Sequence, residues 1–411
     1  MKKLILLIQV TLFFLSLSDA YSQWYPQTSG TTRGLYCVSF GDAYNGTIVG
    51  RLGTIVRTTN GGLSWSLQSS YTTSWLSGVS FTNANTGTAV GDWGTIRRTT
   101  NGGTSWGLQT VGTISWLLDV SFTDANTGTA VGESGTILRT TNGGINWTLQ
   151  TSGTTYPLES VSFTDANTGT TVGATGTILR TTNGGTNWTS QTSGTTNNLS
   201  GVCFTDANTG TAVGGIGIIL RTTNGGTNWT SQTSGTTNNL SGVFFTDANT
   251  GTVVGGYILT GGKILRTING GTTWISQTSG TMNYLQGVSF TDANTGMIVG
   301  DFGTILRTTN GGTSFINQIS SEIPERFSLY QNYPNPFNTL TKTKFDIPKA
   351  SYIKLIVYDV LGREIKTLVN EKLNAGRYEV DWNGFDYPSG VYIYKLHTGD
   401  FVNVKKMVLI K

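Results

Sequence analysis

Residues 136–147 read TILRTTNGGINW, and near-copies of this stretch recur along most of the chain. The Asn-Gly-Gly of the copies begins at Asn60, Asn101, Asn142, Asn183, Asn224, Asn269 and Asn310. Five of the six spacings are 41 residues and one is 45. A fixed period of about 40 residues with several short strands per unit is typical of a closed β-propeller, in which each blade covers its neighbour's apolar face.

Each unit predicts four antiparallel strands, A to D. In the unit 117–153 we expect strand A around Val120 and Phe122, strand B at 129–132, strand C at 136–141 and strand D at 146–150. An Asp-Ala-Asn-Thr-Gly turn joins A to B, and an Asn-Gly turn joins C to D. The sequence therefore predicts an all-β chain whose residues 23–319 form a seven-bladed β-propeller.

The ring can close in two ways, because strand D has eight copies and strands A to C have seven. Its first copy begins at Trp24 and its last at Phe315. Residues 24–28 can pair with the last blade and join the two ends of the ring. Alternatively, the Phe315 strand continues its own hairpin at a smaller cost in loop entropy. The last copy has lost its Trp and its Thr-Ser-Gly ending, which favours closure by residues 24–28.

The ends of the chain differ in composition from the repeats. Lys2 and Lys3 precede an apolar run and small residues near Ala20, which predicts a secretory signal peptide at 1–22. Residues 21–320 hold 11 basic and 11 acidic side chains, and this neutrality argues against a nucleic-acid partner. After a linker at 320–328, residues 329–411 predict a small Ig-like β-sandwich, with strands at 343–346, 352–359, 378–382, 391–397 and 402–410.

Few residues in the propeller can carry catalysis or bind metal. The single histidine, His397, lies in the C-terminal part, and Cys37 and Cys203 occupy non-equivalent positions, so we expect two free thiols. The segment from Asp124 resembles the start of a calcium loop, but Gly135 stands where that loop needs a glutamate. We therefore expect a turn there, with no metal, no cofactor and no catalytic residue.

The turns of a meander blade lie on two faces. The A–B and C–D turns are nearly identical in all units, and we call their side the uniform face. The B–C turns and D–A connections vary, and we call their side the variable face. Its candidate ligand-binding residues are Arg33, Arg51, Trp75, Asp92, Trp93, Trp116, Glu133, Tyr156, Tyr257, Tyr284, Asp301 and Phe302. Aromatic rings can stack on a ligand and carboxylates can accept its hydrogen bonds, so the hypothesis is a glycan or protein site. Neutral drift of loop tips is the alternative.

Seven strand C arginines repeat with the blades: Arg57, Arg98, Arg139, Arg180, Arg221, Arg266 and Arg307. Sialidases hold a substrate carboxylate with three arginines, so this ring requires an explanation. Because the arginines recur in every blade near the uniform face, we expect them to pack against the neighbouring Trp and to donate hydrogen bonds to turn carbonyls.

Two resemblances follow from these motifs. The repeat TTNGGINW at 140–147 resembles the Asp-box of bacterial neuraminidases, with Asn in place of Asp, and the whole unit is similar to the propellers of photosystem II assembly factors. Residues YPNPFN at 333–338, SGVYIY at 389–394 and KMVLIK at 406–411 resemble the C-terminal sorting domain of the type IX (Por) secretion system. The second resemblance implies export across an outer membrane through contacts of residues 329–411 with that machinery.

The sequence thus predicts a secreted, monomeric propeller at the cell surface or outside the cell, which binds a glycan or protein without catalysis. A sialidase-like glycoside hydrolase is one alternative, and it would need a Tyr nucleophile, a partner acid and an Arg cluster on the variable face. An assembly scaffold, as the photosystem resemblance implies, is the other.

Overall fold

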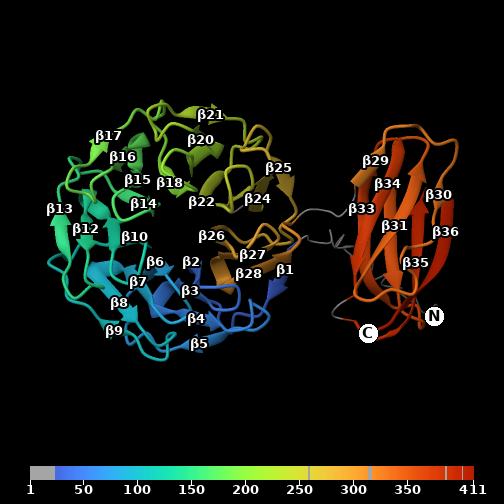
Figure 1. The fold of residues 1–411 in the computed structure, drawn as a ribbon, viewed down its shortest axis with the longest axis horizontal. Helices are drawn as coiled ribbons and strands as arrows, with labels where there is room; N and C mark the ends of the chain where they lie inside the picture. The colour runs from blue at the N-terminus through green and yellow to red at the C-terminus, as the bar shows by residue number, and fades with distance from the viewer. Residues whose placement is uncertain (1–23, 258–259, 313–316, 385–386, 400) are drawn as a thin grey trace, which may run out of the picture.

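The computed structural model describes residues 24–257, 260–312, 317–384, 387–399 and 401–411. The signal peptide predicted at 1–22 and the Phe315 copy of strand D lie outside these residues. The described residues form nine four-stranded antiparallel sheets, and their only helical elements are six short 3-10 turns. Seven sheets are arranged in a ring, and the other two form a separate unit beside it (Figure 1). No described helix has the length and apolar character needed to cross a membrane.

The seven ring sheets are blades 1 to 7 in chain order. Blade 1 contains β2 (Leu35–Phe40), β3 (Gly46–Gly50), β4 (Ile55–Thr58) and β5 (Ser66–Gln68). Blade 2 contains β6 (Leu76–Phe81), β7 (Gly87–Gly91), β8 (Thr95–Thr99) and β9 (Gly107–Leu108). Blade 3 contains β10 (Leu117–Phe122), β11 (Gly128–Gly132), β12 (Ile137–Thr140) and β13 (Thr148–Gln150). Blade 4 contains β14 (Leu158–Phe163), β15 (Gly169–Gly173), β16 (Ile178–Thr181) and β17 (Thr189–Ser190). Blade 5 contains β18 (Leu199–Phe204), β19 (Gly210–Gly214), β20 (Ile219–Thr222) and β21 (Thr230–Gln232).

The last two blades depart from this pattern. Blade 6 contains β22 (Asn239–Phe245), β23 (Gly251–Tyr257), β24 (Gly261–Thr267) and β25 (Ile275–Gln277). Its longer B–C segment, which the sequence placed in a loop, mostly extends the two strands, because Gly256 pairs with Gly262 and Tyr257 with Gly261. Blade 7 contains β26 (Leu285–Phe290), β27 (Thr295–Gly300), β28 (Ile305–Thr309) and the N-terminal strand β1 (Tyr25–Gln27).

Ring closure uses the N-terminal strand. Tyr25 pairs with Arg307 and Gln27 with Ile305, so the segment before the first repeat completes the last blade. The Trp24 side chain is fully buried and its Nε1 donates to Gln277 Oε1 at 2.9 Å, in blade 6. The closure therefore joins the two ends of the propeller through a strand pair and through the buried indole of Trp24.

The core lies between neighbouring blades. One apolar cluster joins Val90 and Ile96 of blade 2 to Leu117, Val120 and Leu138 of blade 3, and equivalent clusters recur around the ring. Each Trp of strand D meets a Phe of its own blade edge-on, as Trp147 does with Phe122 at 5.9 Å between centroids. The Trp147 Nε1 also donates to Gln109 of blade 2, so one side chain contributes to the core and to blade coupling.

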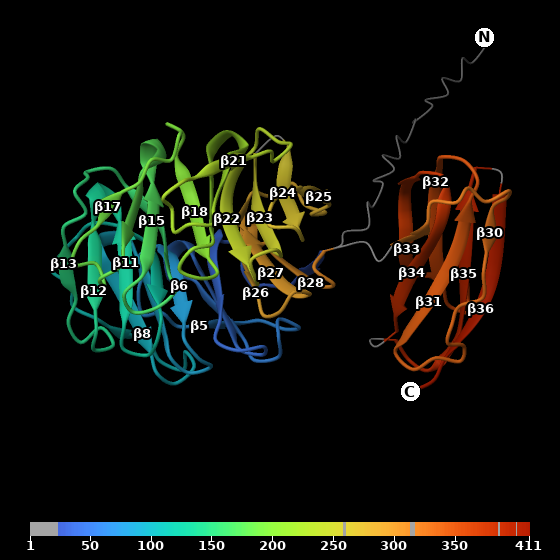
Figure 2. The same cartoon turned by 45° about the horizontal axis from the view of Figure 1, so that its top comes forward.

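Two sheets follow the propeller. One contains β29 (Asn317–Ser320), β30 (Ser328–Leu329), β31 (Leu340–Ile347) and β34 (Gly376–Asn383). The other contains β32 (Ser351–Tyr358), β33 (Glu364–Leu373), β35 (Gly390–Thr398) and β36 (Phe401–Leu409). A single apolar cluster with residues from both sheets, such as Phe345 and Tyr394, makes this unit a β-sandwich (Figure 2).

Sequence reasoning missed three strands of this sandwich: β29, β30 and β33. It placed no strand at β33, where polar Glu364, Lys366, Asn370 and Glu371 interrupt the apolar pattern and two register shifts break the ladder with β32. It also placed a linker at 320–328, whereas β29 already pairs with β34 through Asn317 and Glu379. The sheet of the C-terminal unit thus begins with residues that the sequence assigned to the last blade.

Candidate functional site

The structure places the turns on two faces as the repeat predicted. On the uniform face, the C–D turn bonds the A–B turn of its own blade, as Gly143 N does with Asn126 O at 2.9 Å. On the variable face, the B–C turn bonds the connection that precedes strand A, as Glu133 N does with Trp116 O at 2.9 Å. Each face is therefore a ring of paired segments around the propeller axis.

The uniform face uses its polar side chains to join the blades. Arg139 donates from Nη1 to Thr129 Oγ1 at 2.7 Å and from Nη2 to Ala166 O in the next blade. Its guanidinium lies 4.9 Å from the ring centroid of Phe163, also in the next blade. The sequence expected this cation to pack against Trp, which was wrong, because the Trp edge is already used by a Phe and a Gln. The expected bond to a turn carbonyl is present.

Five further strand C arginines repeat this arrangement, with the guanidinium over a Phe and a bond to a turn alanine carbonyl: Arg57, Arg98, Arg180, Arg221 and Arg266. Arg307 differs, and its Nε donates to Gly61 O at 2.9 Å. Its partner residue in strand B is Met297, where the other blades have a Thr that accepts from the arginine.

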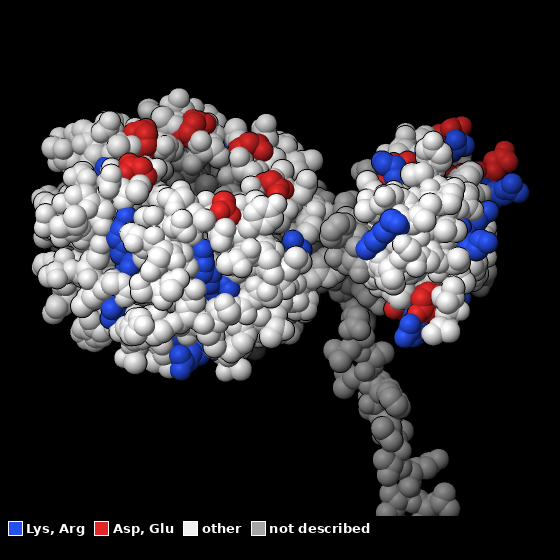
Figure 3. Space-filling model, turned by 60° about the horizontal axis from the view of Figure 1, so that its bottom comes forward, with Lys and Arg blue, Asp and Glu red and all other residues white. Residues whose placement is uncertain are grey.

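Aspartates surround the central opening of the uniform face. Six A–B turns carry an exposed aspartate, at Asp42, Asp124, Asp165, Asp206, Asp247 and Asp292. Figure 3 shows acidic side chains gathered in a ring around the hollow of this face. Asp124 Oδ1 accepts from Asn126 N at 2.7 Å and Thr127 N at 3.0 Å, and these bonds lower the pKa of its carboxyl. This segment is thus a hydrogen-bonded turn, and the described residues contain no cluster of three or more His, Cys, Asp or Glu placed to hold a metal ion.

The B–C turns of the variable face share one backbone geometry. Six of them are short 3-10 turns: η1 (Arg51–Gly53), η2 (Asp92–Gly94), η3 (Glu133–Gly135), η4 (Ala174–Gly176), η5 (Gly215–Gly217) and η6 (Asp301–Gly303). The third residue is always glycine, because at Gly53 φ is +66° and a Cβ would lie 2.0 Å from Thr72 O. Glycine is therefore required here by both conformation and space.

The second residue of each B–C turn adopts a left-handed backbone and points its side chain into solvent. These residues are Leu52, Trp93, Ser134, Thr175, Ile216 and Phe302, with φ between 54° and 57°. Bulky or branched side chains rarely adopt this conformation, which costs roughly 1–2 kcal/mol per residue. Trp93 and Phe302 are nevertheless 65% and 74% exposed. Large apolar side chains are thus displayed at positions where a glycine would be less strained.

The first residue of each B–C turn lies near the mouth of the central channel. Asp301 Oδ1 accepts from Gln286 Nε2 at 3.1 Å, and the guanidinium of Arg51 lies 4.8 Å from the ring centroid of Trp75. Tyr36 also contacts Trp75, with centroids 6.1 Å apart. Trp75 is therefore in contact with Arg51 and Tyr36, and 38% of it remains exposed.

Trp93 and Trp116 form a second aromatic pair, edge-on with centroids 5.9 Å apart. Trp116 is 43% exposed, so both rings keep open surface beside blades 2 and 3. Tyr156 and Tyr257 are also exposed, each by 51%. The expected ligand residues thus include four rings with open surface at these positions, and a fifth, Trp75, that keeps 38% exposure beside its contacts with Arg51 and Tyr36.

The remaining expected residues are more peripheral or more buried. Arg33 is exposed, and its Nη1 donates to Leu52 O at 3.3 Å. Tyr284 is half-buried, and its hydroxyl lies 2.5 Å from Ser241 Oγ. Burial raises the pKa of the Tyr284 phenol.

Sequence reasoning missed three residues that line the channel mouth: Tyr36, Glu159 and Gln286. They occupy the second position of strand A, where the seven blades carry Tyr36, Ser77, Leu118, Glu159, Ser200, Ser241 and Gln286. This position varies between blades as much as the loops do, and that variation was the available signal. Burial raises the pKa of the Glu159 carboxyl, and the nearby Glu133 carboxylate raises it further. Burial likewise raises the pKa of the Asp92 carboxyl.

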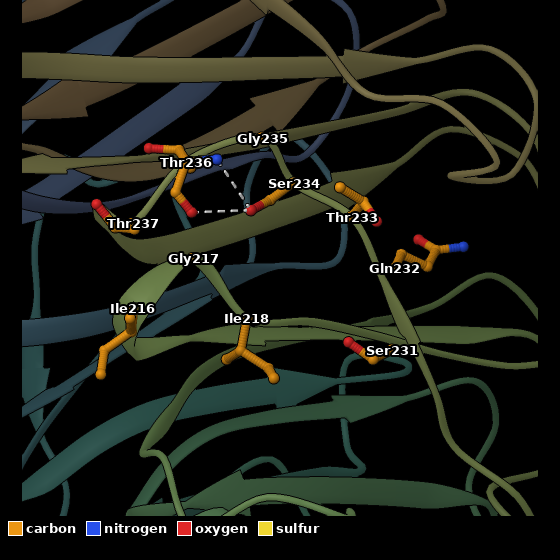
Figure 4. A pocket seen from close by; sticks show the side chains of 10 residues that line it. All are labelled: Ile216, Gly217, Ile218, Ser231, Gln232, Thr233, Ser234, Gly235, Thr236 and Thr237. Carbon is orange, nitrogen blue, oxygen red and sulfur yellow. Dashed lines mark hydrogen bonds between the residues drawn. The ribbon is translucent and has the colours of Figure 1, made fainter.

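Three hollows lie between the B–C turns or the D–A connections and strand D, and two of them are lined by the expected residues Tyr156 and Arg33. One, of about 670 Å³, lies between the B–C turn and the strand D segment of blade 5 (Figure 4). Its polar groups are used internally: Ser234 Oγ donates to Thr236 O, and Gln232 bonds Gly270 O and the Trp274 indole. Such a hollow offers few free donors or acceptors to a ligand.

Comparison with known proteins agrees with this architecture. Residues 106–238 and 148–283 match the family described as "Photosynthesis system II assembly factor YCF48", and residues 331–411 match the "Secretion system C-terminal sorting domain". The propeller is thus similar to YCF48 in its repeats, and the C-terminal unit matches a secretion-system sorting domain. The sorting-domain match indicates export by the type IX system, to the cell surface or the extracellular space.

Solved structures support the fold alone. "YCF48 bound to D1 peptide" is 20% identical with a TM-score of 0.60, and covers 71% of this chain and 96% of its own. "YCF48 from Cyanidioschyzon merolae" is 22% identical with a TM-score of 0.59, and covers 69% and 98%. The WD40 propeller domain of Doa1 is 13% identical with a TM-score of 0.56, and covers 69% and 96%. No curated protein matches the chain in sequence.

Proposed function

We propose that this chain is an exported, non-catalytic binding protein, and that its propeller holds an extracellular glycan or protein on the variable face. The observation that carries the proposal is the difference between the faces. Arginines and turn aspartates of the uniform face are engaged within the fold, whereas Trp93 and Phe302 stay exposed on strained turns and Trp116 stays exposed beside Trp93. Strain and apolar exposure are both unfavourable for the isolated protein, which supports a role in contact with a ligand.

The comparison adds a precedent for a protein ligand. One structural neighbour is a YCF48 propeller bound to a peptide. At 20% identity this likeness extends only to the fold, so it supports the capacity of such a ring to present a binding face. The residues that would make contact here must come from this chain's own variable face.

A sialidase-like hydrolase is the weaker alternative. Tyr36 lies beside Asp301 and Arg51, which superficially supplies a phenol, an acid and a cation. Burial raises the pKa of the Tyr36 phenol, and the Asp301 and Asp92 carboxylates raise it further, while Arg51 lowers it. A phenol whose pKa is raised is a poorer nucleophile at neutral pH, and the single cation acting on it does not make an arginine cluster.

The test is a binding screen of the purified protein on a glycan array and on a displayed peptide library. A Trp93→Ala/Trp116→Ala variant removes the open aromatic pair. A Leu63→Ala/Ile145→Ala variant is the matched control, since these side chains are 61% and 78% exposed on the uniform face. We expect ligands of the unaltered protein to be lost by the first variant and kept by the second. Equal binding by all three proteins, or no ligand for any, would contradict the proposal.

A further inference from the structure

Four carboxylates lie around the channel mouth on one sector of the variable face. Asp92, Glu133 and Asp301 each begin a B–C turn, and their backbone N–H groups donate to the residue before strand A. A Cβ on Gly34 would lie 3.5 Å from Asp301 Oδ1 and 3.3 Å from the Tyr36 ring, so Asp301 of blade 7 lies beside blade 1, and Glu159 is the second residue of strand A in blade 4. Only two arginines, Arg33 and Arg51, belong to the expected binding residues of this face. The sector that runs from blade 7 through blades 1 to 4 therefore carries a net negative charge.

Among the described residues, none of these four carboxylates takes part in an ion pair, whereas the C-terminal sandwich holds several, such as Lys342 with Glu379. Asp301 receives a hydrogen bond from Gln286, which is a neutral donor. Partly buried carboxylates that lack a cation are unfavourable in the free protein, and a cation supplied by a ligand would relieve that cost.

Aromatic rings accompany the carboxylates on the same turns. Asp92 is followed by Trp93 and Asp301 by Phe302, so a carboxylate near the channel is joined to a displayed ring. Arg51 shows how a guanidinium is held on this face, because it lies over Trp75 at 4.8 Å. A carboxylate beside an aromatic face is the combination that holds lysine and arginine side chains, through charge-assisted hydrogen bonds and cation–π contact.

The B–C turns of blades 4 to 6 lack carboxylates, although blade 6 keeps the exposed ring of Tyr257. The first B–C positions of blades 4, 5 and 6 are Ala174, Gly215 and Gly256, which have no polar side chain. The residues just before strand A in blades 5 and 6 are Asn198 and Asn239, which have neither charge nor ring. A ligand that matched this pattern would therefore lie across blades 7, 1, 2 and 3, to one side of the channel.

We propose that the occupant of this sector is a protein segment with exposed lysine or arginine side chains. This inference rests on the proposed function and names the chemistry of its ligand. A neutral glycan would leave the excess of carboxylates over arginines in this sector uncompensated, and an anionic glycan would be repelled by it. A basic segment fits both the carboxylates and the aromatic rings of this sector. Its ammonium or guanidinium groups would contact the carboxylates, and its alkyl stems would cover the rings of Trp93 and Trp116.

The test measures binding of a deca-lysine peptide and a deca-glutamate peptide to the purified full chain. An Asp92→Asn/Glu133→Gln/Asp301→Asn variant removes three charges with little change in shape. An Asp124→Asn/Asp165→Asn/Asp206→Asn variant is the matched control, since it removes three charges from the uniform face and keeps the turn-capping Oδ1 atoms. Binding is measured at two salt concentrations, and circular dichroism and thermal unfolding check that each variant folds.

We expect the lysine peptide to bind the unaltered protein and the control alike, and the glutamate peptide to bind neither. The variable-face variant should bind the lysine peptide about tenfold more weakly, because each exposed ion pair contributes a few tenths to 1 kcal/mol. Added salt should weaken binding for the same reason. A Trp93→Ala/Trp116→Ala variant should also bind more weakly, which bulk charge alone would not produce.

Two results would overturn the inference. In the first, the uniform-face variant loses lysine-peptide binding and the variable-face variant keeps it, which places the cation site among the turn aspartates. In the second, no lysine peptide binds although the glycan screen finds a ligand that depends on Trp93 and Trp116. That outcome leaves the proposed binding function intact with a different ligand, whereas failure of both screens removes the function as well.

Discussion

Arg139 and Arg51 illustrate the difference between the two faces of the propeller. Arg139 lies near the uniform face, 7% exposed, and its guanidinium contacts Thr129, the Ala166 carbonyl and the Phe163 ring. Arg51 lies on the variable face, exposed to solvent, and its described contact is the ring of Trp75. The first arginine recurs because it joins neighbouring blades. The second occupies a position whose residue differs between blades, and its contact with Trp75 is not repeated around the ring.

The largest expected effect comes from removing one coupling arginine. Arg139→Ala leaves the Thr129 hydroxyl and the Ala166 carbonyl without their charged donor, and should lower the free energy of unfolding by about 3 kcal/mol. Arg51→Ala should change it by less than about 0.5 kcal/mol. Urea denaturation of both variants measures the difference. Equal losses would mean that the variable face contributes as much to blade coupling as the uniform face.

Two glycine substitutions compare a tightly packed position inside a blade with an open position in a connection. A Cβ on Gly128, the first residue of β11, would lie 2.5 Å from the Phe122 ring. Gly128→Ala should therefore lower the free energy of unfolding by roughly 1–3 kcal/mol, which thermal unfolding can measure. Gly112, before strand A of blade 3, has no atom within 4 Å of such a Cβ, so Gly112→Ala should change stability little. If both variants unfold alike, Phe122 can move and the packing is not tight.

The half-buried Asp119 predicts a pH dependence of opposite sign to that of the turn aspartates. Asp119 accepts from Ser160 Oγ and Val161 N in the next blade, and burial raises the pKa of its carboxyl to about 6. A pKa raised above the unfolded value means that the folded state binds the proton more tightly. Stability should therefore fall as pH rises from about 4 through about 6, on the order of 2 kcal/mol.

Asp119→Ser gives this site the residue that blade 4 has at Ser160, where the hydroxyl accepts from Val202 N at 3.3 Å. We expect this variant to lose the decline in stability between pH 4 and 7. The turn aspartates have lowered pKa values, so their contribution is lost only as pH falls below about 4. A variant that keeps the full decline would show that another group titrates in this range.

The smallest expected effect concerns the displayed rings. Phe302→Gly removes a left-handed bulky residue, and should raise the free energy of unfolding by up to about 1 kcal/mol, which calorimetry can detect. Ser134→Gly at the equivalent turn of blade 3 is the matched control for backbone strain alone. Loss of stability in the Phe302 variant would mean that its ring is part of the packed structure, and would weaken its assignment to ligand contact.

The repeat period and the turn motifs were enough to predict most of the fold. Identical Asn-Gly-Gly turns at regular spacing predicted the blades, and the lost Trp of the last repeat favoured closure by the N-terminal strand, which Tyr25 and Arg307 confirm. The sequence could not show which aromatic ring the strand C arginines contact, because Phe and Trp both recur once in each repeat. Their relative position across a blade boundary depends on how neighbouring sheets stack.

The candidate site was only partly accessible from sequence. Variable turns could be recognised as loops, but the Arg51 contact that covers Trp75 depends on the direction of two side chains from different blades. Tyr36, Glu159 and Gln286 were missed because they lie within strand A, where one varied residue among apolar neighbours was taken for part of the strand pattern. Comparing equivalent positions inside strands as well as in loops would have found them.

Hydrogen–deuterium exchange with a bound ligand tests the central claim most directly. The account predicts that the ligand protects amides at 92–94 and 115–117 on the variable face, and leaves those at 124–128 and 142–146 on the uniform face unchanged. Protection confined to the uniform-face turns would contradict the account, because it would place the ligand on the side chains that hold the blades together.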